Sequence, residues 1–328
     1  MKTVNKAGLD IGYSNVKVAF GDGDSPPETV VLPAGAGPID QASKAMINNP
    51  GAEEAFHVQV AGKQWVAGIE PDRIEGVERE VHTNYPRTDV YRALFHAAML
   101  YTGADEITTL VTGLPVAEYN DGKNATNLAA SLTGRHVITE DRSILVHNVE
   151  VLPQPVGGFL DYAFHINNDE VLRQGRLLVL DPGFFSFDWA LFQGSELRLK
   201  SSGTSLNAMS AVIENVSRCL REEAHVKVPV ERIERELRAG NHSIISGNKR
   251  HSLDGYLEEA LSELGTQALT ALQRTLRRDD ATVDVVYIVG GGAMLYRDFA
   301  AKVFNLSEIV VAPNPVLSNV RGFYYFGA

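Results

Sequence analysis

Residues 8–18 place apolar side chains on both sides of a short polar turn, and residues 177–191 repeat this arrangement. Each stretch is typical of a strand, a tight turn and a returning strand. An aspartate, Asp10 in the first and Asp181 in the second, ends the first strand of each. Because the two stretches lie near the starts of the two halves of the 328-residue chain, we expect a duplicated domain with one such hairpin in each half.

The remaining hydrophobic pattern predicts alternating strands and helices. Most of residues 21–55 are rich in Gly, Pro and Ala and indicate loops. In the first half we expect strands at 29–32, 107–112, 136–139 and 144–153, a hairpin at 55–68, and helices at 89–102, at 123–132 and from 156. In the second half we expect a helix at 206–223 capped by residues 201–205, a short helix from Val230, a solvated loop at 242–252, a long amphipathic helix at 253–278, a buried strand at 284–289, a helix at 294–304 and a strand at 309–311.

Composition limits the class of protein. The chain is 44% hydrophobic and 22% charged, as soluble globular proteins are, and no apolar run approaches the 18 or so residues of a membrane span. The N-terminus leads into a strand without a signal-peptide core, and the single cysteine, Cys219, fits a reducing cytoplasm. The net charge of −11 argues against direct nonspecific DNA binding by the whole surface, although a local basic patch or a DNA-binding partner stays open.

The chemistry of the first hairpin favours a phosphate ligand. Its turn offers backbone amides and the Ser14 hydroxyl, and Lys17 follows on the returning strand. The Asp10 carboxylate would repel a phosphate by about 4 kcal/mol at an effective dielectric constant near 20. It therefore fits best with a cation between the two anions, for which we expect Mg²⁺. The alternative is an ordinary hairpin that has an aspartate next to its turn.

Five stretches occur in an order that resembles the actin-like ATPase superfamily. They are the Asp10 hairpin, the strand end at 113–115, the helix start at Pro153-Gln154, the Asp181 hairpin and the glycine run at 290–293. Within the superfamily, 114–119 (Leu-Pro-Val-Ala-Glu-Tyr) and 151–154 (Val-Leu-Pro-Gln) resemble stretches of ParM/StbA-type plasmid-segregation proteins. The Asp-Pro-Gly-Phe form of the second hairpin also resembles the D protein of PRTRC plasmid-associated systems.

The resemblance implies an α/β fold of duplicated actin-like, ribonuclease H-like domains, each with a mixed five-stranded sheet flanked by helices. A nucleotide would lie in the interdomain cleft. The first domain would span residues 1–165, with a small insertion at about 30–85, and regain residues 316–328. The second would span residues 166–315, with a helical insertion at about 205–282.

The resemblance also implies roles for individual residues. Asp10 and Asp181 would hold Mg²⁺ through its waters, and Gln154 would position the attacking water. The nucleotide would be bound by Gly12, Tyr13, Ser14, Asn15, Lys17, Gly183, Phe184, Phe185, Ser186, Gly203, Gly290, Gly291, Gly292 and Ala293.

Three features leave alternatives open. ParM has a glutamate where this chain has Gln154, whereas actin has a glutamine near this place, so the water-activating group is open. Asp188 is an alternative group that would orient the loop or a metal-bound water. The glycines at 290–292 would also suit a simple turn into a helix.

The resulting expectation is a cytoplasmic filament-forming ATPase for plasmid DNA segregation. It would use ATP, with GTP as the alternative nucleotide, together with Mg²⁺, and would act with a DNA-binding adaptor protein and no membrane. Two other classes stay open, a nonpolymerising nucleotide-binding scaffold and a small-molecule kinase. A kinase would need a carboxylate base directed into the cleft, and the zinc-binding cysteines of one compact sugar-kinase group are absent.

Overall fold

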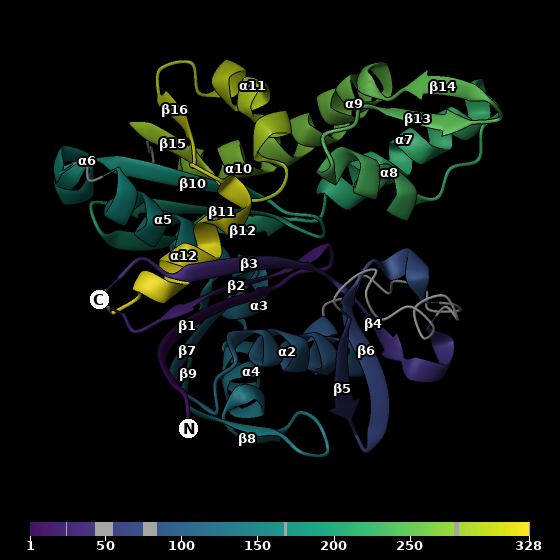
Figure 1. Cartoon of the computed structure of the whole chain (residues 1–328). Coiled ribbons are helices and arrows are strands. Elements are labelled where there is room, and N and C mark those ends of the chain that lie inside the picture. The colour runs from purple at the N-terminus through teal and green to yellow at the C-terminus, as the bar shows by residue number, and fades with distance from the viewer. Residues whose placement is uncertain (24, 43–54, 75–83, 167–168, 279–281, 328) are drawn as a thin grey trace. The chain divides into compact units, whose positions relative to one another are not determined.

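The computed structural model describes residues 1–23, 25–42, 55–74, 84–166, 169–278 and 282–327 (Figure 1). By its internal contacts the chain divides into two units. Unit 1 contains Met1–Phe164 and Asn319–Ala328, and unit 2 contains His165–Ser318. The chain passes from one unit to the other at Phe164 and returns at Ser318, so its last helix belongs to the first unit. Among the described residues, no helix is long and apolar enough to cross a membrane.

Unit 1 is built on a six-stranded sheet with the strand order β3-β2-β1-β7-β9-β8. The central strands β1, β7 and β9 are parallel, whereas β2, β3 and β8 run antiparallel to their neighbours. The strands are β1 (Thr3–Ile11), β2 (Asn15–Gly21), β3 (Glu28–Pro33), β7 (Glu106–Leu114), β8 (Gly134–Val137) and β9 (Ser143–Pro153). The first sheet thus has one strand more than the five we expected, because β8 adds to the edge of β9.

A second, three-stranded sheet of unit 1 has the order β4-β6-β5 and lies within the expected insertion. Its strands are β4 (Gly35–Pro38), β5 (Phe56–Val60) and β6 (Lys63–Ile69). Residues 43–54 and 75–83 of that insertion are outside the described residues. The helical elements of the unit are η1 (Ile39–Gln41), η2 (Pro71–Arg73), η3 (Tyr85–Arg87), α2 (Asp89–Thr102), α3 (Val116–Asn120), α4 (Lys123–Leu132), α5 (Gln154–His165) and α12 (Ser318–Tyr325).

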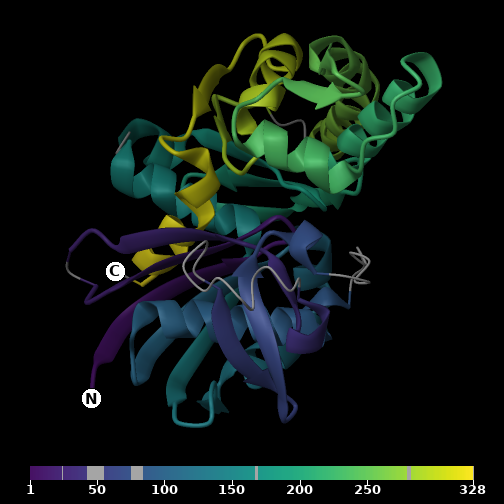
Figure 2. The same ribbon diagram turned by 45° about the vertical axis from the view of Figure 1, so that its right-hand side comes forward.

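Helices cover both faces of the large sheet of unit 1. Figures 1 and 2 show α2 on one face and α12 on the other. Gly8 of β1 lies directly against the backbone of α12 at Val320 and Tyr324, where a Cβ atom would collide. The neighbouring residues Ala7 and Leu9 are fully buried, and strand alternation directs them to the opposite face.

Helices α5 and α12 are fastened to each other. Gly157 of α5 and Gly322 of α12 bring the two backbones so close that a side chain at Gly322 would collide with Gly157. Next to this contact, Arg321 donates from Nε and Nη2 to the two carboxylate oxygens of Asp161, over 2.8 and 2.7 Å. Asp161 is fully buried, and the two-pronged geometry is the strongest form of this interaction. The returning C-terminal helix is therefore an integral part of unit 1.

Unit 2 repeats the strand order of unit 1 in a five-stranded sheet, β12-β11-β10-β15-β16. Strands β10, β15 and β16 are parallel, and β11 and β12 are antiparallel additions, as in the first sheet. The strands are β10 (Arg176–Pro182), β11 (Phe187–Gln193), β12 (Glu196–Ser205), β15 (Val285–Ile288) and β16 (Glu308–Val311). This shared topology confirms the duplication expected from the two hairpins.

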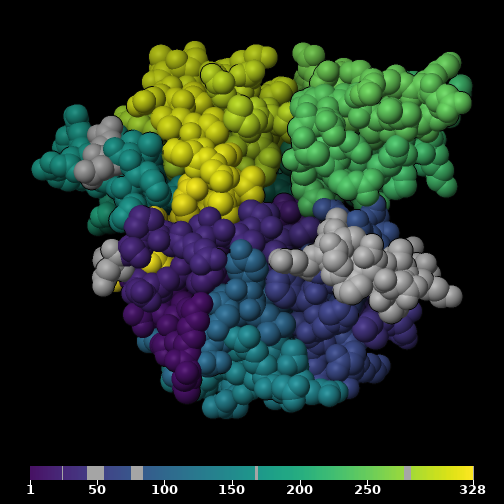
Figure 3. Space-filling model, in the orientation of Figure 1, coloured from purple at the N-terminus to yellow at the C-terminus, as the bar shows by residue number. Residues whose placement is uncertain are grey.

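Most helices of unit 2 lie between β12 and β15. The unit contains α6 (Asp169–Gln174), α7 (Met209–Glu223), α8 (Val230–Arg238), α9 (Asp254–Ala260), the π-helical turn η4 (Leu261–Gly265), α10 (Thr266–Arg278), α11 (Ala293–Val303) and η5 (Pro315–Leu317). One hydrophobic core joins β10, β11 and β15 to α7, α8, α9 and α10. In the space-filling view the inserted segment forms a green lobe beside the yellow C-terminal part of the same unit (Figure 3).

Two expectations for unit 2 are wrong. Residues 201–205 do not cap a helix, because they continue β12 and Ser205 pairs with Phe187 of β11; the helix begins only at Met209. Residues 242–252 are not a loop but a hairpin of β13 (Ser243–Ser246) and β14 (Lys249–Ser252). Its turn residues Gly247 and Asn248 both have positive φ, as a two-residue type I′ turn requires.

Candidate functional site

The first hairpin joins β1 and β2 through residues 12–14. Asp10 and Lys17 are cross-strand partners, and Lys17 Nζ lies 2.8 Å from Asp10 Oδ2. Both groups are largely buried, with side-chain exposures of 7% and 16%. Because each group compensates the charge of the other, loss of either one would leave an unpaired buried charge. The turn is closed by a hydrogen bond from Gly12 N to Asn15 O, over 3.0 Å.

Gln154 reaches this hairpin from another part of unit 1. It follows the last residue of β9 and is the first residue of α5, as the sequence predicts. Its Nε2 atom lies 3.5 Å from Asp10 Oδ1, although the two residues are 144 positions apart. Gly113 at the end of β7 makes room for it, since a Cβ atom there would lie 2.9 Å from Gln154 Cγ. Three predicted site residues, Asp10, Lys17 and Gln154, are thus brought together.

A stack of tyrosine rings supports the turn of the first hairpin. Tyr13 stacks on Tyr85 with ring centroids 4.1 Å apart, and Tyr85 meets Tyr91 edge to face at 5.5 Å. The Tyr85 hydroxyl donates to Gly12 O over 3.4 Å. Burial raises the pKa of Tyr91 well above its ordinary value, so its hydroxyl stays protonated at neutral pH. The turn is therefore tied to the start of α2, which lies far from it in sequence.

The second hairpin, between β10 and β11, has the same turn. Gly183 N donates to Ser186 O over 2.9 Å, and Gly183 follows Asp181 by the same two positions that separate Gly12 from Asp10. Counted over the whole residue, Asp181 is 6% exposed, close to the 5% of Asp10. The carbonyl oxygens of Gly183 and Phe184 accept hydrogen bonds from the amides of Met209 and Ser210 at the start of α7, which fixes the loop on that helix.

The two hairpins differ at the cross-strand partner of the aspartate. Asp188 of β11 faces Asp181, where Lys17 faces Asp10 in unit 1. Asp188 is 1% exposed and accepts hydrogen bonds from the hydroxyls of Ser186 and Thr204. These contacts fit the alternative that Asp188 orients the loop.

The glycine run after β15 closes around Asp181. Gly290 has φ +79°, and a Cβ atom there would collide with Asp181 Oδ1. Gly292 N donates to Pro182 O over 2.9 Å, and a Cβ at Gly292 would lie 2.8 Å from that same oxygen. Gly291 is exposed and has open space around its Cβ position. Gly290 and Gly292 are thus required for the approach to β10, whereas Gly291 is free to face a ligand.

The remaining predicted residues are placed as follows. Ser14 lies in the first turn, and its hydroxyl accepts a hydrogen bond from Asn15 Nδ2 over 3.3 Å. Phe184 and Phe185 are partly buried in the second turn, and Phe184 contacts the core of unit 2. Ala293 is buried at the start of α11. Gly203 of β12 lies against the Trp189 indole, since a Cβ atom there would come within 2.6 Å of the ring, and it therefore has a packing role within the sheet.

The carboxylates near the two hairpins suit a metal ion that is bound mainly by water molecules and by the phosphates of a bound nucleotide. Within the described residues no three His, Cys, Asp or Glu side chains form a metal-binding group. Asp10 and Asp181 each offer a buried carboxylate beside a glycine turn. Mg²⁺ keeps several waters and is usually bound through one or two carboxylates and substrate phosphates, so these residues fit it.

Sequence reasoning missed several residues around the hairpins. Tyr85 and Thr204 contact them only through the fold, and no local pattern marks either residue. A repeat in the sequence was a usable signal. The string Pro153-Gln154-Pro155-Val156 begins at the last residue of β9, and a similar string, Pro-Asn-Pro-Val at 313–316, follows the equivalent strand β16.

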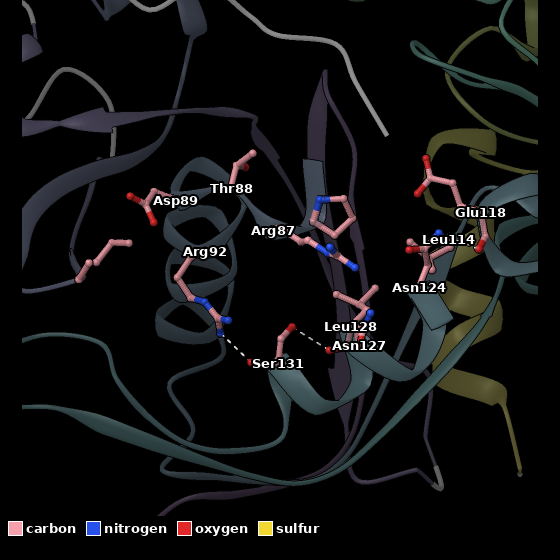
Figure 4. Close-up of a pocket in the computed structure, with 13 residues that line it drawn as sticks. Arg87, Thr88, Asp89, Arg92, Leu114, Glu118, Asn124, Asn127, Leu128 and Ser131 are labelled. Atoms are coloured by element: carbon pink, nitrogen blue, oxygen red, sulfur yellow. Dashed lines mark hydrogen bonds between the residues drawn. The ribbon is translucent and has the colours of Figure 1, made fainter. Parts of the chain in front are cut away.

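A separate cavity of about 450 Å³ lies in unit 1 between the start of α2, α4 and the β5–β6 turn (Figure 4). Arg87, Asp89 and Arg92 are on its α2 side, with Glu118 and Asn124 across from them. The Arg92 guanidinium donates to Ser131 O over 2.8 Å and spans the gap between α2 and α4. None of the site residues predicted from the sequence lines this cavity.

Comparisons with known proteins agree with this architecture. Residues 8–157 match the family model of the N-terminal domain of actin-like proteins, and residues 179–301 match that of the C-terminal domain of archaeal MreB-like actin homologues. A search of curated proteins found no match.

Several solved structures share the fold over nearly the whole chain. The archaeal actin homologue Ta0583 has 17% identity and a TM-score of 0.77, with 98% of each chain covered. A non-polymerisable quadruple mutant of pCBH ParM has 18% identity and a TM-score of 0.77, with 99% of each chain covered. A 15-stranded ParM filament from Clostridium botulinum has 17% identity and a TM-score of 0.75, covering 100% of this chain and 99% of that one.

The two duplicated sheets, each with an Asp–Gly hairpin, define an actin-like protein. Residues 8–157 and 179–301 match families of actin-like domains, and the whole chain has the actin-like fold seen in ParM structures, as the sequence predicted.

Proposed function

We propose that this protein is a filament-forming ATPase that moves or positions plasmid DNA. The observation that carries the proposal is the matched pair of Asp–Gly turns. Each turn lies at the same place in one of two equivalent sheets, with the same closing hydrogen bond and a buried aspartate. The duplication keeps both turns, but the cross-strand partner of the aspartate is Lys17 in the first and Asp188 in the second. This difference is expected if the two turns bind different parts of one asymmetric ligand.

In this proposal the two turns bind the phosphates of one ATP. The backbone amides of both turns hold phosphate oxygens, and Lys17 compensates their charge. Asp10 and Asp181 would hold Mg²⁺, and the bound ion would neutralise part of the phosphate charge. Gln154, which already lies beside Asp10, orients a water molecule with its neutral amide. Gly291, whose Cβ position is open, lets the nucleotide approach the backbone after β15.

Nucleotide binding would control assembly through the link between the two units. A triphosphate bound by both hairpins would favour the arrangement of the units in which both hairpins contact the γ-phosphate. Loss of the γ-phosphate would remove these contacts and with them the preference for that arrangement. A head-to-tail contact that does not close into a ring propagates as a filament. Solved filaments of ParM and of Alp12 have this fold, which supports the same assembly for this chain. A separate DNA-binding adaptor would connect the filament to the plasmid, because the net charge of −11 disfavours direct binding.

The Asp181→Ala variant tests the shared site. We expect it to fold and to lose Mg²⁺-dependent phosphate release from ATP. Asp298→Ala, an exposed change on α11 that removes the same charge, is the matched control and keeps wild-type turnover. Wild-type hydrolysis by folded Asp181→Ala protein would exclude the assignment. Nucleotide binding and hydrolysis without any assembly would instead favour the scaffold class.

A further inference from the structure

A second cavity of unit 1, of about 560 Å³, adjoins the cavity in Figure 4 and shares Arg92 and Ser131 with it. We call it the arginine–histidine cavity after four residues of its lining, Arg92, His96, Arg135 and His136. Among the described residues that form its walls there is no aspartate or glutamate. The walls come from α2, α4, β8 and the β5–β6 hairpin, all in unit 1. The cavity therefore gathers positive charge in a chain whose net charge is −11.

Hydrogen bonds connect the walls of the arginine–histidine cavity. Gln59 N of β5 donates to Ile138 O, just after β8, over 2.7 Å. On another side, Arg92 Nη1 of α2 donates to Ser131 O of α4 over 2.8 Å. Because these bonds join each wall to a neighbouring one, the cavity is formed by the fold itself and needs no ligand to create it.

The two arginines bring hydrogen-bond donors to the cavity without a negative partner. Arg92 is half-buried, and Arg135 is exposed and donates from Nη1 to the Ser143 hydroxyl over 3.0 Å. In the described part of the chain neither guanidinium forms an ion pair. Burial lowers the pKa of Arg92 despite the Asp89 carboxylate, which lines only the cavity of Figure 4. An anion bound beside Arg92 would therefore compensate a charge that water solvates poorly, and the planar fork of a guanidinium suits the oxygens of a carboxylate or a phosphate.

The two histidines bring acceptors to the same cavity. His96 Nδ1 lies 2.8 Å from Gln59 O, and His136 Nε2 lies 2.8 Å from Leu132 O. Because a carbonyl oxygen only accepts, these nitrogens carry the ring hydrogens, and in the neutral rings His96 Nε2 and His136 Nδ1 are left as acceptors. Burial lowers the pKa of both rings, to about 4 for His96, and the charge of Arg92 lowers both further. Both rings are therefore neutral at pH 7, and their centroids lie 6.2 Å apart.

We propose that the arginine–histidine cavity binds the phosphate group of a small ligand in its singly protonated form. The phosphate O–H donates to a neutral histidine nitrogen, and the charged oxygens accept from Arg92 and Arg135. A carboxylate fits less well because it has no proton to donate at neutral pH, and two guanidinium groups would repel a metal cation. The volume is in the range of small-molecule sites, so the ligand extends beyond the phosphate. None of the residues predicted to bind the nucleotide lines this cavity, so the site is separate from the two hairpins.

Nuclear magnetic resonance of isotope-labelled histidine rings in the full chain tests the site, since a phosphate bound at the hairpins does not contact these rings. We expect methyl phosphate to shift the ring nitrogens of His96 and His136 saturably at about pH 6. Its affinity should fall roughly tenfold at about pH 8, because the second pKa of a phosphate monoester is near 6 and the required proton is lost. Methyl sulfate has the charge of the protonated ester but no acidic proton, so its affinity should change less than about twofold over this range.

Two charge variants locate the binding. Arg135→Gln, a change at an exposed residue, should weaken methyl phosphate binding roughly tenfold because it removes charged hydrogen bonds to the ligand. Lys63→Gln is the matched control: it removes one positive charge from the β5–β6 hairpin outside the cavity lining and should change the affinity less than about twofold. Phosphatidylcholine vesicles that contain phosphatidic acid should compete with methyl phosphate if the natural phosphate belongs to a lipid headgroup, and should not compete if it belongs to a soluble ligand; either result supports the site.

The proposal is wrong if the two histidine rings do not respond to methyl phosphate, or if Arg135→Gln binds it as well as Lys63→Gln does. Equal affinity for methyl sulfate at about pH 6 would also overturn it, because the proton would then have no role. A response of the rings to Zn²⁺ in place of methyl phosphate would overturn it in favour of a metal site.

Discussion

Replacement of Gly290 by alanine should disturb the second hairpin through Asp181. Gly290 has φ +79°, a conformation that costs an L-residue about 1–2 kcal/mol. The new Cβ atom would also collide with Asp181 Oδ1, so the carboxylate must move. Together these effects should lower the stability of unit 2 by roughly 2 kcal/mol or more, or its melting temperature by roughly 4–8 °C.

Gly291→Ala is the matched control for Gly290→Ala. Its Cβ position has no heavy atom within 4 Å, so its stability should stay within about 0.5 kcal/mol of wild type. Thermal unfolding followed by circular dichroism, with phosphate release measured on the same samples, compares the two variants. The reasoning is refuted if Gly290→Ala melts at the temperature of Gly291→Ala and hydrolyses ATP at the wild-type rate.

Three further predictions concern unit 1. Gln154→Ala should bind nucleotide nearly normally but hydrolyse it slowly in single-turnover assays. If the variant instead lost nucleotide binding and kept the wild-type hydrolysis rate, the role of Gln154 would be structural. Tyr85→Ala should weaken nucleotide binding up to about tenfold in titrations because it removes the stack under Tyr13, whereas Tyr85→Phe keeps the stack; equal affinities would contradict this. Burial lowers the pKa of His96 to about 4 from 6.5, so the unfolded chain binds more protons between these values and stability falls as the pH drops through this range. The free energy of unfolding, measured in urea, should fall less between pH 7 and pH 5 in His96→Asn than in the wild type, by roughly 2 kcal/mol. The same pH dependence in both proteins would contradict this prediction.

One long periodic helix was predicted with its observed bounds. Helix α2 occupies Asp89–Thr102 as expected, because Thr88 caps its first turn and Gly103, with φ +65°, ends it. The duplication of the domain, with a mixed sheet in each half, followed from the two hairpins and the superfamily resemblance, whereas the sixth strand of the first sheet was not expected. The bounds of this helix and the duplication of the domain depend on residues close together in the sequence, so the pattern of apolar residues predicts them.

Features that depend on distant neighbours could not be predicted. The β13–β14 hairpin was missed because only Ile244 is buried in it and most of the surrounding residues are polar or basic, as in a solvated loop. Residues 201–205 look like a helix cap, yet pairing with β11 keeps them in a strand. Around the first turn, the placement of Gln154 beside Asp10 was anticipated by motif order, whereas the stack of Tyr85 on Tyr13 has no local signal.

Light scattering with ATP and Mg²⁺ tests the central claim most directly. Above a critical protein concentration, scattering should rise after ATP is added and decay as ATP is consumed, and a slowly hydrolysed analogue should make the signal persist. The account is contradicted if the protein stays monomeric with either nucleotide at high concentration and near-physiological salt, and no added adaptor restores assembly.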